Sequence, residues 1–303
     1  MKEKIFINLI KSVLNSKYIG DDCAYLKDLG IVVSQDSLVE DVHFSRSFAN
    51  AYQIGYKSVM VNISDICASG AEPKYLTIAL SLPDCVDEHF VKDFYMGAKD
   101  AAGKVEIVGG DITGADKIYI SVTAIGAVGE RKISSRSSAK IGQKIVISGP
   151  HGSSGAGLRE LMSGKREEDE FISAHLMPKA RLDFSEKISS NIKQDYAMMD
   201  TSDGLMDALV AIAESSGVCL EIDFNKIPYC NGLKNFENWQ DLIFFGGEDY
   251  ELVATVPDNM DLKDGFVIGK VVEGRGVRVD YGNSSKFYTG EDIEKNLFNH
   301  FKE

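Results

Sequence analysis

The chain has 303 residues, of which 33 are basic and 46 acidic, so its formal net charge is −13. This excess of negative charge disfavours binding to nucleic acid or to an anionic membrane, and we expect neither as a partner. Hydrophobic residues make up 44% of the chain and charged residues 26%, which is typical of an ordinary globular protein. The length exceeds that of a usual single domain, so we expect two domains.

The cysteines and the N-terminal segment bear on the compartment. The five cysteines are widely spaced and form no C-x-x-C pair, which argues against a disulfide framework or a zinc ribbon. The segment MKEKIFINLIKSVLNSK repeats its apolar residues at helical spacing, so it is predicted to be an amphipathic helix and not a signal peptide. No apolar run reaches the roughly 18 residues of a membrane-spanning helix. These features predict a cytoplasmic protein.

Strands and helices alternate in the first half of the chain. A strand at 30–33 is predicted to enter a polar loop at 34–37, and a strand at 105–108 is predicted to end at Gly109-Gly110-Asp111. The other elements predicted there are helices at 52–69 and 86–98 and strands at 75–82 and 118–128.

A polar, serine-rich and basic segment at 129–140 marks the best candidate domain boundary, which we place between residues 134 and 135. The second half is predicted to contain strands at 144–147, 196–199 and 250–256. A helix is expected to open at Leu158, and a second helix, capped by Ser202 or Asp203, to continue through Ile212. The alternation indicates a mixed α/β (α+β) fold in two domains, 1–134 and 135–303.

Acidic residues recur where apolar runs end, at Asp21, Asp22, Asp36, Asp65, Asp111, Asp200, Asp203 and Glu248. A single aspartate in such a place usually completes a turn or caps a helix. Here several of them adjoin glycines, which permit close backbone approach to a bulky polyphosphate. Carboxylates repel one another, so a fold that gathers them needs cations, and an all-oxygen set suits Mg²⁺. Because Mg²⁺ usually completes its shell with phosphate oxygens, the pattern predicts nucleotide phosphate chemistry.

The glycine-rich segment at 149–157 leaves two interpretations open. It resembles a phosphate-binding loop but lacks the Gly-Lys-Ser/Thr of a Walker A motif, and it fits equally well with a tight strand-to-helix turn. His43 closes the loop after Asp36, where it is either a surface or capping imidazole or a contact for an anionic substrate. His151 and His175 are expected in turns or at the surface. No Ser-His-Asp or Cys-His arrangement has local support, so we expect no covalent or general-base catalytic residue.

Eight blocks in order give the chain a specific resemblance: IGDDCA (19–24), SQDSLVEDVHF (34–44), NISDICASGAEPKYLTIALSLP (62–83), VGGDIT (108–113), SGPHGSSGAGL (148–158), HLMPKAR (175–181), DTSDGL (200–205) and GGEDYEL (246–252). Over nearly its whole length the chain resembles the thiamine-monophosphate kinase family, which is similar to aminoimidazole ribonucleotide synthetase. The resemblance implies an N-terminal domain that binds ATP and Mg²⁺ and forms a barrel across a homodimer. It also implies a C-terminal α+β domain that completes the nucleotide and substrate site.

The activity implied by the resemblance is ATP-dependent phosphorylation of thiamine monophosphate to thiamine diphosphate. The matching motifs imply Mg²⁺ ligands at Asp22, Ser34, Gln35, Asp36, Asp65, Asp111, Asp200 and Asp203. They imply nucleotide contacts at Tyr95, Gly110, Asp111, Arg136 and Ser202, and substrate contacts at His43, Glu248 and Phe298. Phe301 is the alternative to Phe298. Gln35 stands where the family often has threonine, so its expected contribution is a backbone carbonyl.

The predicted mechanism is direct in-line transfer of the γ-phosphoryl group to the phosphate of thiamine monophosphate, with Mg²⁺ offsetting the repulsion between two polyanions. Two rivals are kept. One is a relative of the same fold that activates an amide or selenide, although no cysteine precedes Cys23 and the chain ends in Phe-Lys-Glu rather than in a reactive cysteine. The other is a nucleotide-binding protein without catalytic activity.

Overall fold

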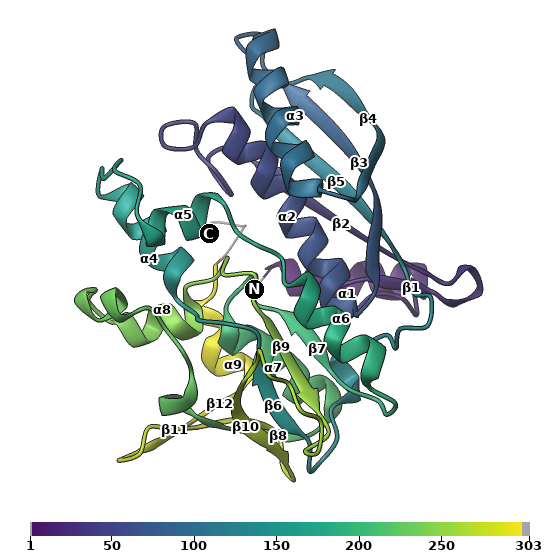
Figure 1. Ribbon diagram of the computed structural model, residues 1–303, viewed down its shortest axis with the longest axis vertical. Coiled ribbons are helices and arrows are strands. Elements are labelled where there is room, and N and C mark those ends of the chain that lie inside the picture. The colour runs from purple at the N-terminus through teal and green to yellow at the C-terminus, as the bar shows by residue number, and fades with distance from the viewer. Residues whose placement is uncertain (1, 299–303) are drawn as a thin grey trace.

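The computed structural model describes residues 2–298, whose strands form two open sheets with helices packed against them (Figure 1). The first sheet has the strand order β1-β2-β5-β3-β4 and the second the order β12-β11-β8-β10-β6-β9-β7. The mixed α/β architecture is therefore confirmed. Neither sheet of the described residues closes on itself, and the boundary between residues 134 and 135 stays a prediction.

The first sheet comprises Ala24–Leu26 (β1), Ile31–Val39 (β2), Glu72–Leu82 (β3), Glu106–Gly114 (β4) and Tyr119–Ala127 (β5). Two helices, Ala51–Ser69 (α2) and Glu88–Ala102 (α3), lie across one face of it (Figure 1). Every second residue of β3 and β5 is buried, as the two-residue repeat of a strand with one covered face requires. Asn50 begins α2 with a capping box that includes Gln53.

Two strands of this sheet run further than the sequence pattern predicted. The predicted polar loop at 34–37 belongs to β2, because these residues pair in register with 121–124 of β5. Their polar side chains alternate between the two faces, which hides the strand from a search for apolar runs. Likewise, β4 continues through Gly109-Gly110-Asp111, because these residues pair with Thr77, Ile78 and Ala79 of β3.

The second sheet comprises Lys144–Ile147 (β6), Met198–Asp200 (β7), Cys219–Asp223 (β8), Leu252–Val256 (β9), Phe266–Val272 (β10), Gly276–Asp280 (β11) and Ser285–Tyr288 (β12). Its helices are Ser153–Met162 (α4), Glu170–Leu176 (α5), Leu182–Asn191 (α6), Leu205–Ser216 (α7), Trp239–Phe245 (α8) and Gly290–Ile293 (α9). Residues of β6, β9 and α7 form the centre of its core, among them Ile147, Leu209 and Val253.

The helix starts in this half differ from the predicted ones. Helix α4 begins at Ser153, five residues before Leu158, because the Asp249 carboxylate accepts hydrogen bonds from the Gly152 and Ser154 N–H groups. Helix α7 begins after Gly204, which has a φ of 111° and provides no side-chain cap. The prediction that Ser202 or Asp203 caps this helix is wrong, and both residues are left in the turn that precedes it.

Helix α2 connects the two sheets. Its Ser64 hydroxyl donates to an Asp200 carboxylate oxygen at the end of β7 (2.7 Å), and its Cys67 carbonyl accepts from Ser185 of α6 (2.6 Å). The same helix, which packs on the first sheet, therefore also contacts a strand and a helix of the second half of the chain.

The predicted N-terminal helix is confirmed as Lys2–Leu14 (α1). Its apolar residues Ile5, Leu9, Ile10, Val13 and Leu14 are exposed. Within residues 2–298, no helix combines the length and the apolar character needed to cross a membrane.

Candidate active site

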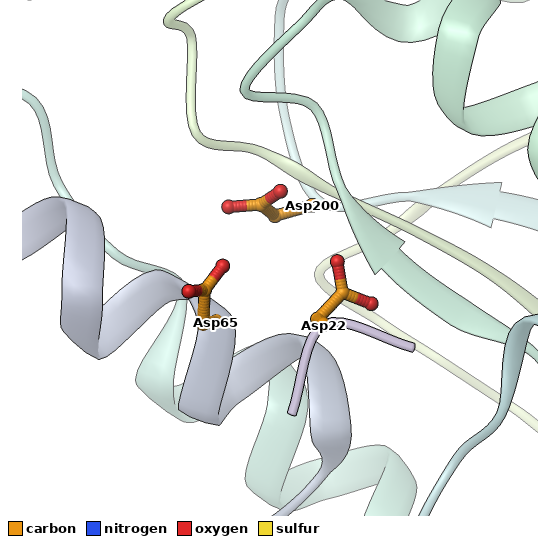
Figure 2. A group of neighbouring side chains, drawn as sticks. All are labelled: Asp22, Asp65 and Asp200. Carbon is orange, nitrogen blue, oxygen red and sulfur yellow. The ribbon is translucent and has the colours of Figure 1, made fainter. Parts of the chain in front are cut away.

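Three aspartates that are far apart in the sequence converge between the two halves of the structure. Figure 2 shows Asp22 on a loop, Asp65 on α2 and Asp200 at the end of β7, with their carboxylates directed toward one another. One oxygen of each lies within 4.8 Å of the others. The sequence predicted all three as metal ligands, and the fold brings them together.

The electrostatics of this cluster are unfavourable for three anions. Burial foremost, and then the charge of Asp22, raises the pKa of Asp200 to about 7. Burial, followed by the Asp36 and Asp200 charges, holds the pKa of Asp65 well above its ordinary range. Burial also raises the pKa of Asp22, although Arg136 opposes this shift. Each carboxylate is thus more easily protonated than in water unless a cation is present.

Further predicted ligands surround the three aspartates. Ser34 of β2 donates a hydrogen bond to the Asp65 carboxylate. Asp36 lies two residues along β2, where burial and then the Asp22 charge raise the pKa of its carboxyl group. A cavity of about 390 Å³ is lined by Asp22, Asp36, Asp65, Arg136 and Ser202, among other residues. This oxygen-rich donor set is the kind that Mg²⁺ prefers, so these residues fit the predicted ion.

Arg136 approaches the cluster from the loop after β5. Its guanidinium lies 2.7 Å from an Asp22 oxygen, and its backbone N–H donates to Asp21 at 2.7 Å. Its Nε is buried, and nothing among residues 2–298 accepts a hydrogen bond from it. Ser202 donates its hydroxyl to Asp200 at 3.0 Å. Of the predicted nucleotide-contacting residues, Arg136 and Ser202 therefore line the cavity, and the buried Arg136 Nε has no acceptor among the described residues.

Gln35 is oriented differently from its neighbours. Its side-chain amide donates to Ser121 (3.1 Å) and accepts from Thr123 (3.2 Å), both on β5. Both amide atoms are thus engaged along the sheet. A backbone contribution at this position remains the prediction.

A second cluster forms around Glu248, in the loop before β9. A carboxylate oxygen of Glu248 lies 2.9 Å from Lys57 Nζ of α2, and the other lies 3.3 Å from His175 Nδ1 of α5. Burial alone would raise the pKa of Glu248, but Lys57 foremost, together with His175 and His43, holds this pKa below its ordinary value. The predicted substrate residues His43 and Glu248 therefore lie near each other.

Sequence reasoning missed Lys57 and misplaced His175. Lys57 lies in a helix whose apolar pattern alone was considered, yet it is buried. His175 is buried inside α5, where burial and then the Lys57 charge lower its pKa to about 4, so the expectation of a turn or surface position is wrong. His151 lies outside any helix or strand, just before α4, but it is fully buried. For Lys57, the signal available in the sequence was a lysine on the apolar side of a predicted helix, which indicates a buried and therefore paired charge.

Some predicted site residues do not join the cluster. Asp111 pairs in register with Ala79, which pairs with Ser121, which pairs with Ser37 of β2. Three strand spacings of about 4.8 Å therefore place Asp111 about 14 Å from β2. Gly110 is next to it, and Tyr95 lies half-buried on α3, 5.4 Å from Phe94 between ring centroids.

The remaining predicted residues are placed as follows. Asp203 lies in the turn between β7 and α7. Phe298 is exposed at the end of the described chain, and Phe301 lies outside the described residues.

The glycine-rich segment is explained by the structure as a helix start. The Asp249 carboxylate binds the N-terminal N–H groups of α4 with bonds of 2.7 and 2.9 Å, where a phosphate would otherwise bind. Glycine is required at position 157, because an added Cβ would lie 2.0 Å from the Phe171 carbonyl oxygen. The turn interpretation is thus favoured over a phosphate loop.

Comparison with known proteins places this geometry in a family. Residues 20–128 match the model of the N-terminal domain of AIR synthase related proteins, and residues 140–282 match that of the C-terminal domain. A thiamine-monophosphate kinase of Aquifex aeolicus is 38% identical over 310 residues, covering 97% of this chain and 96% of that protein. One of Bacillus subtilis is 38% identical over 251 residues, covering 78% and 77%.

Solved structures agree with the sequence comparison. The structure of AaThiL complexed with AMPPCP and TMP superposes with a TM-score of 0.88 at 37% identity, covering 98% of this chain and 96% of that one. The two matched domains, the relatives and the shared structure lead to one assignment: the chain belongs to the AIR synthase related family and, within it, to the thiamine-monophosphate kinases.

Proposed function

We propose that the chain phosphorylates thiamine monophosphate with ATP, giving thiamine diphosphate and ADP. The observation that carries this conclusion is the Asp22–Asp65–Asp200 cluster in a chain that closely matches AaThiL, which was solved with AMPPCP, an ATP analogue, and TMP. AMPPCP and TMP stand for the phosphoryl donor and its acceptor.

The cluster residues have separate tasks in the proposed reaction. Asp22, Asp36, Asp65 and Asp200 would hold Mg²⁺, with Ser34 orienting Asp65 and Ser202 orienting Asp200. Bound Mg²⁺ supplies positive charge that offsets the repulsion between the two phosphate groups and the charge of the transition state. Arg136 opposes the protonation of Asp22, and its unpartnered Nε is proposed as a donor to the nucleotide phosphates. Asp203 is proposed as a further ligand from the turn after β7.

The acceptor requires no activation by a strong base, because its attacking oxygen belongs to a phosphate that is already anionic near neutral pH. Within residues 2–298, the buried histidines support this view: burial lowers the pKa of His151 to about 3 and, together with Lys57, that of His175 to about 4. Both are neutral at physiological pH. Glu248 and His43 are proposed to bind the organic part of the acceptor, and Phe298 or Phe301 to pack on its rings.

The cytoplasmic location and the division at residues 134/135 also belong to this proposal. Their support is the spacing of the cysteines and the polar segment at 129–140. They carry no weight in the chemical argument.

A homodimer is part of the proposal, with a barrel formed by the first sheets of two subunits. Apolar side chains on β3, β4 and β5 are exposed at this sheet, namely Tyr75, Val108, Ile112 and Tyr119. Asp111 lies about 14 Å from β2 of its own chain, as the three strand spacings give. Pairing through this sheet would allow Asp111, Gly110 and Tyr95 to serve the site of the other subunit.

Complementation tests this arrangement. Asp36→Ala and Asp111→Ala subunits, each inactive alone, are mixed after reversible dissociation. If each site combines Asp36 of one subunit with Asp111 of the other, one site of every mixed dimer is intact, and random pairing restores about a quarter of the wild-type activity. Activity that stays at zero while mixed dimers form would refute the shared site.

The reaction itself is tested by incubating the protein with ATP, Mg²⁺ and either thiamine monophosphate, thiamine or no acceptor, and separating the products by chromatography. The expected result is thiamine diphosphate from the monophosphate alone, with loss of product on adding EDTA. Nucleotide binding without product would favour a relative that uses another acceptor or a non-catalytic protein.

A further inference from the structure

We propose that Lys57 is a positioning residue, which fixes the Glu248 carboxylate for recognition of the acceptor and so sets acceptor affinity without contacting the acceptor. This inference rests on the proposed function, because it concerns how the same site selects its organic substrate.

The first observation is the burial of the pair. Only 4% of the Lys57 side chain is exposed, and its Nζ lies 2.9 Å from a Glu248 oxygen. Among residues 2–298, Glu248 is the carboxylate within ion-pair distance of this ammonium group. A buried ammonium group is costly to desolvate and is tolerated where a fixed partner repays it. The contact is therefore a defined geometry and not one of many surface arrangements.

The second observation is that Glu248 is held from two sides but stays accessible. Lys57 of α2 contacts one oxygen and His175 of α5 the other, while Ser154 of α4 lies 3.1 Å from the same His175 nitrogen. Even so, 27% of the Glu248 side chain remains exposed. A carboxylate offers about four acceptor sites, so two protein contacts leave capacity for a ligand.

The backbone conformation of the loop that carries Glu248 supports a functional role for this residue. Glu248 has a φ of 56° and Tyr250 a φ of 50°, both in the left-handed region that costs free energy for residues other than glycine. The Glu248 N–H donates to the Ser202 carbonyl at 2.7 Å, and the Ser202 hydroxyl donates to Asp200. Glu248 is thus connected by hydrogen bonds of Ser202 to Asp200 of the carboxylate cluster.

Helix α2 sets the distance between the two clusters. Lys57 and Asp65 are eight residues apart on this helix, a rise of about 12 Å. This capped helix therefore carries Asp65, which belongs to the carboxylate cluster, and Lys57, which supports the Glu248 carboxylate that is proposed to bind the organic end of the acceptor. An acceptor with a phosphate at one end and a hydrogen-bonding ring at the other matches this separation.

The test uses Lys57→Met, which keeps the length of the side chain without its charge, Lys57→Arg, which keeps the charge, and Lys187→Met as a matched control. Lys187 pairs with Asp264 at the surface, outside the site. Thiamine monophosphate binding is measured by calorimetry without nucleotide, and the KM values for both substrates by steady-state kinetics. We expect Lys57→Met to weaken thiamine monophosphate binding by at least about tenfold, since it removes the cation that fixes one Glu248 oxygen and leaves only the contact with His175.

The KM for ATP in Lys57→Met should stay within about twofold of wild type, Lys57→Arg should recover most of the affinity, and Lys187→Met should match wild type. Unchanged binding of thiamine monophosphate to a folded Lys57→Met protein would overturn the inference. So would an equal loss of ATP affinity, which a general structural role would produce.

A double variant covers the case in which Lys57→Met does not fold. Lys57→Met with Glu248→Gln carries neither charge, so no unpaired ion is left buried. If Lys57 acts only through Glu248, this protein binds thiamine monophosphate as weakly as Glu248→Gln alone. A further tenfold loss would mean that Lys57 contacts the acceptor, contrary to the inference. Failure of the wild-type protein to bind thiamine monophosphate would refute the proposed function instead.

Discussion

Replacement of Asp200 by asparagine should stabilise the metal-free protein at alkaline pH while it abolishes activity. Asparagine has nearly the same shape as aspartate and can keep hydrogen bonds to Ser64 and Ser202, but it removes one charge from the Asp22–Asp65–Asp200 cluster. The variant therefore separates the charge of this group from its packing.

The magnitude follows from the pKa. In the folded protein the pKa of Asp200 is raised from 3.8 to about 7, by burial first and by Asp22 next. A carboxyl group with a raised folded pKa holds its proton longer in the folded state, so its ionisation reduces stability as pH rises from about 4 to about 7. A shift of roughly three pKa units corresponds to at most about 4 kcal/mol, lost fully above pH 7.

The assay is urea unfolding in EDTA at pH 5 and pH 8, with Asp84→Asn, at an exposed surface position, as control. Wild-type protein should lose stability toward pH 8. Asp200→Asn should remove about 2.7 kcal/mol of the loss between these two pH values, because about two of the three units lie between pH 5 and the folded pKa of about 7. Adding Mg²⁺ at 100 times its Kd should restore about 2.7 kcal/mol to the wild type and far less to the variant. The reasoning fails if Asp200→Asn is less stable than wild type at pH 8 in EDTA.

Three further predictions concern other parts of the molecule. Asp36→Ala or Asp203→Ala should lower turnover by at least about a thousandfold with thermal unfolding little changed, and near-normal rates in either would remove its assigned role. Gly97→Ala should destabilise the α2–α3 contact by about 1–3 kcal/mol in denaturant titration, because the new Cβ would lie 1.9 Å from the Tyr52 carbonyl oxygen; Gly114→Ala, with open space, is the control. Asp249→Ala should cost about 1–2 kcal/mol by removing the cap of α4, and an unchanged unfolding midpoint would contradict the capping role.

The sequence predicted correctly those elements whose apolar residues follow a regular pattern along the chain. Helix α2 was expected at 52–69 and is found at Ala51–Ser69, because its apolar residues recur at helical spacing and Asn50 provides a cap. The strand at 144–147 was predicted with its exact bounds, since four consecutive residues are buried or nearly so in a central strand. The residues within such elements are sufficient to predict them.

The predictions were wrong where contacts with residues distant in the sequence determine the bounds of an element. Ser34 to Ser37 form a strand because β5 pairs with them, and α4 starts early because Asp249, some 95 residues later, caps it. The resemblance identified Asp22, Asp65 and Asp200 as ligands, but composition alone could not tell which acidic residues meet. The partner of Lys57 lies in a loop nearly two hundred positions away, so its place in an apolar helix pattern could indicate burial but not this partner.

Radiolabelled phosphate gives the most direct test of the central claim, that the γ-phosphoryl group passes straight from ATP to thiamine monophosphate at the carboxylate cluster. The protein is mixed in excess with ATP labelled at the γ-phosphate, thiamine monophosphate and Mg²⁺, quenched at short times, and separated from small molecules. The account predicts that label appears in thiamine diphosphate at the rate at which ATP is lost, and that no label appears on the protein. With Asp65→Asn, neither thiamine diphosphate nor the protein should become labelled. Label that first accumulates on the protein and then moves to product, or ATP loss without labelled thiamine diphosphate, would contradict it.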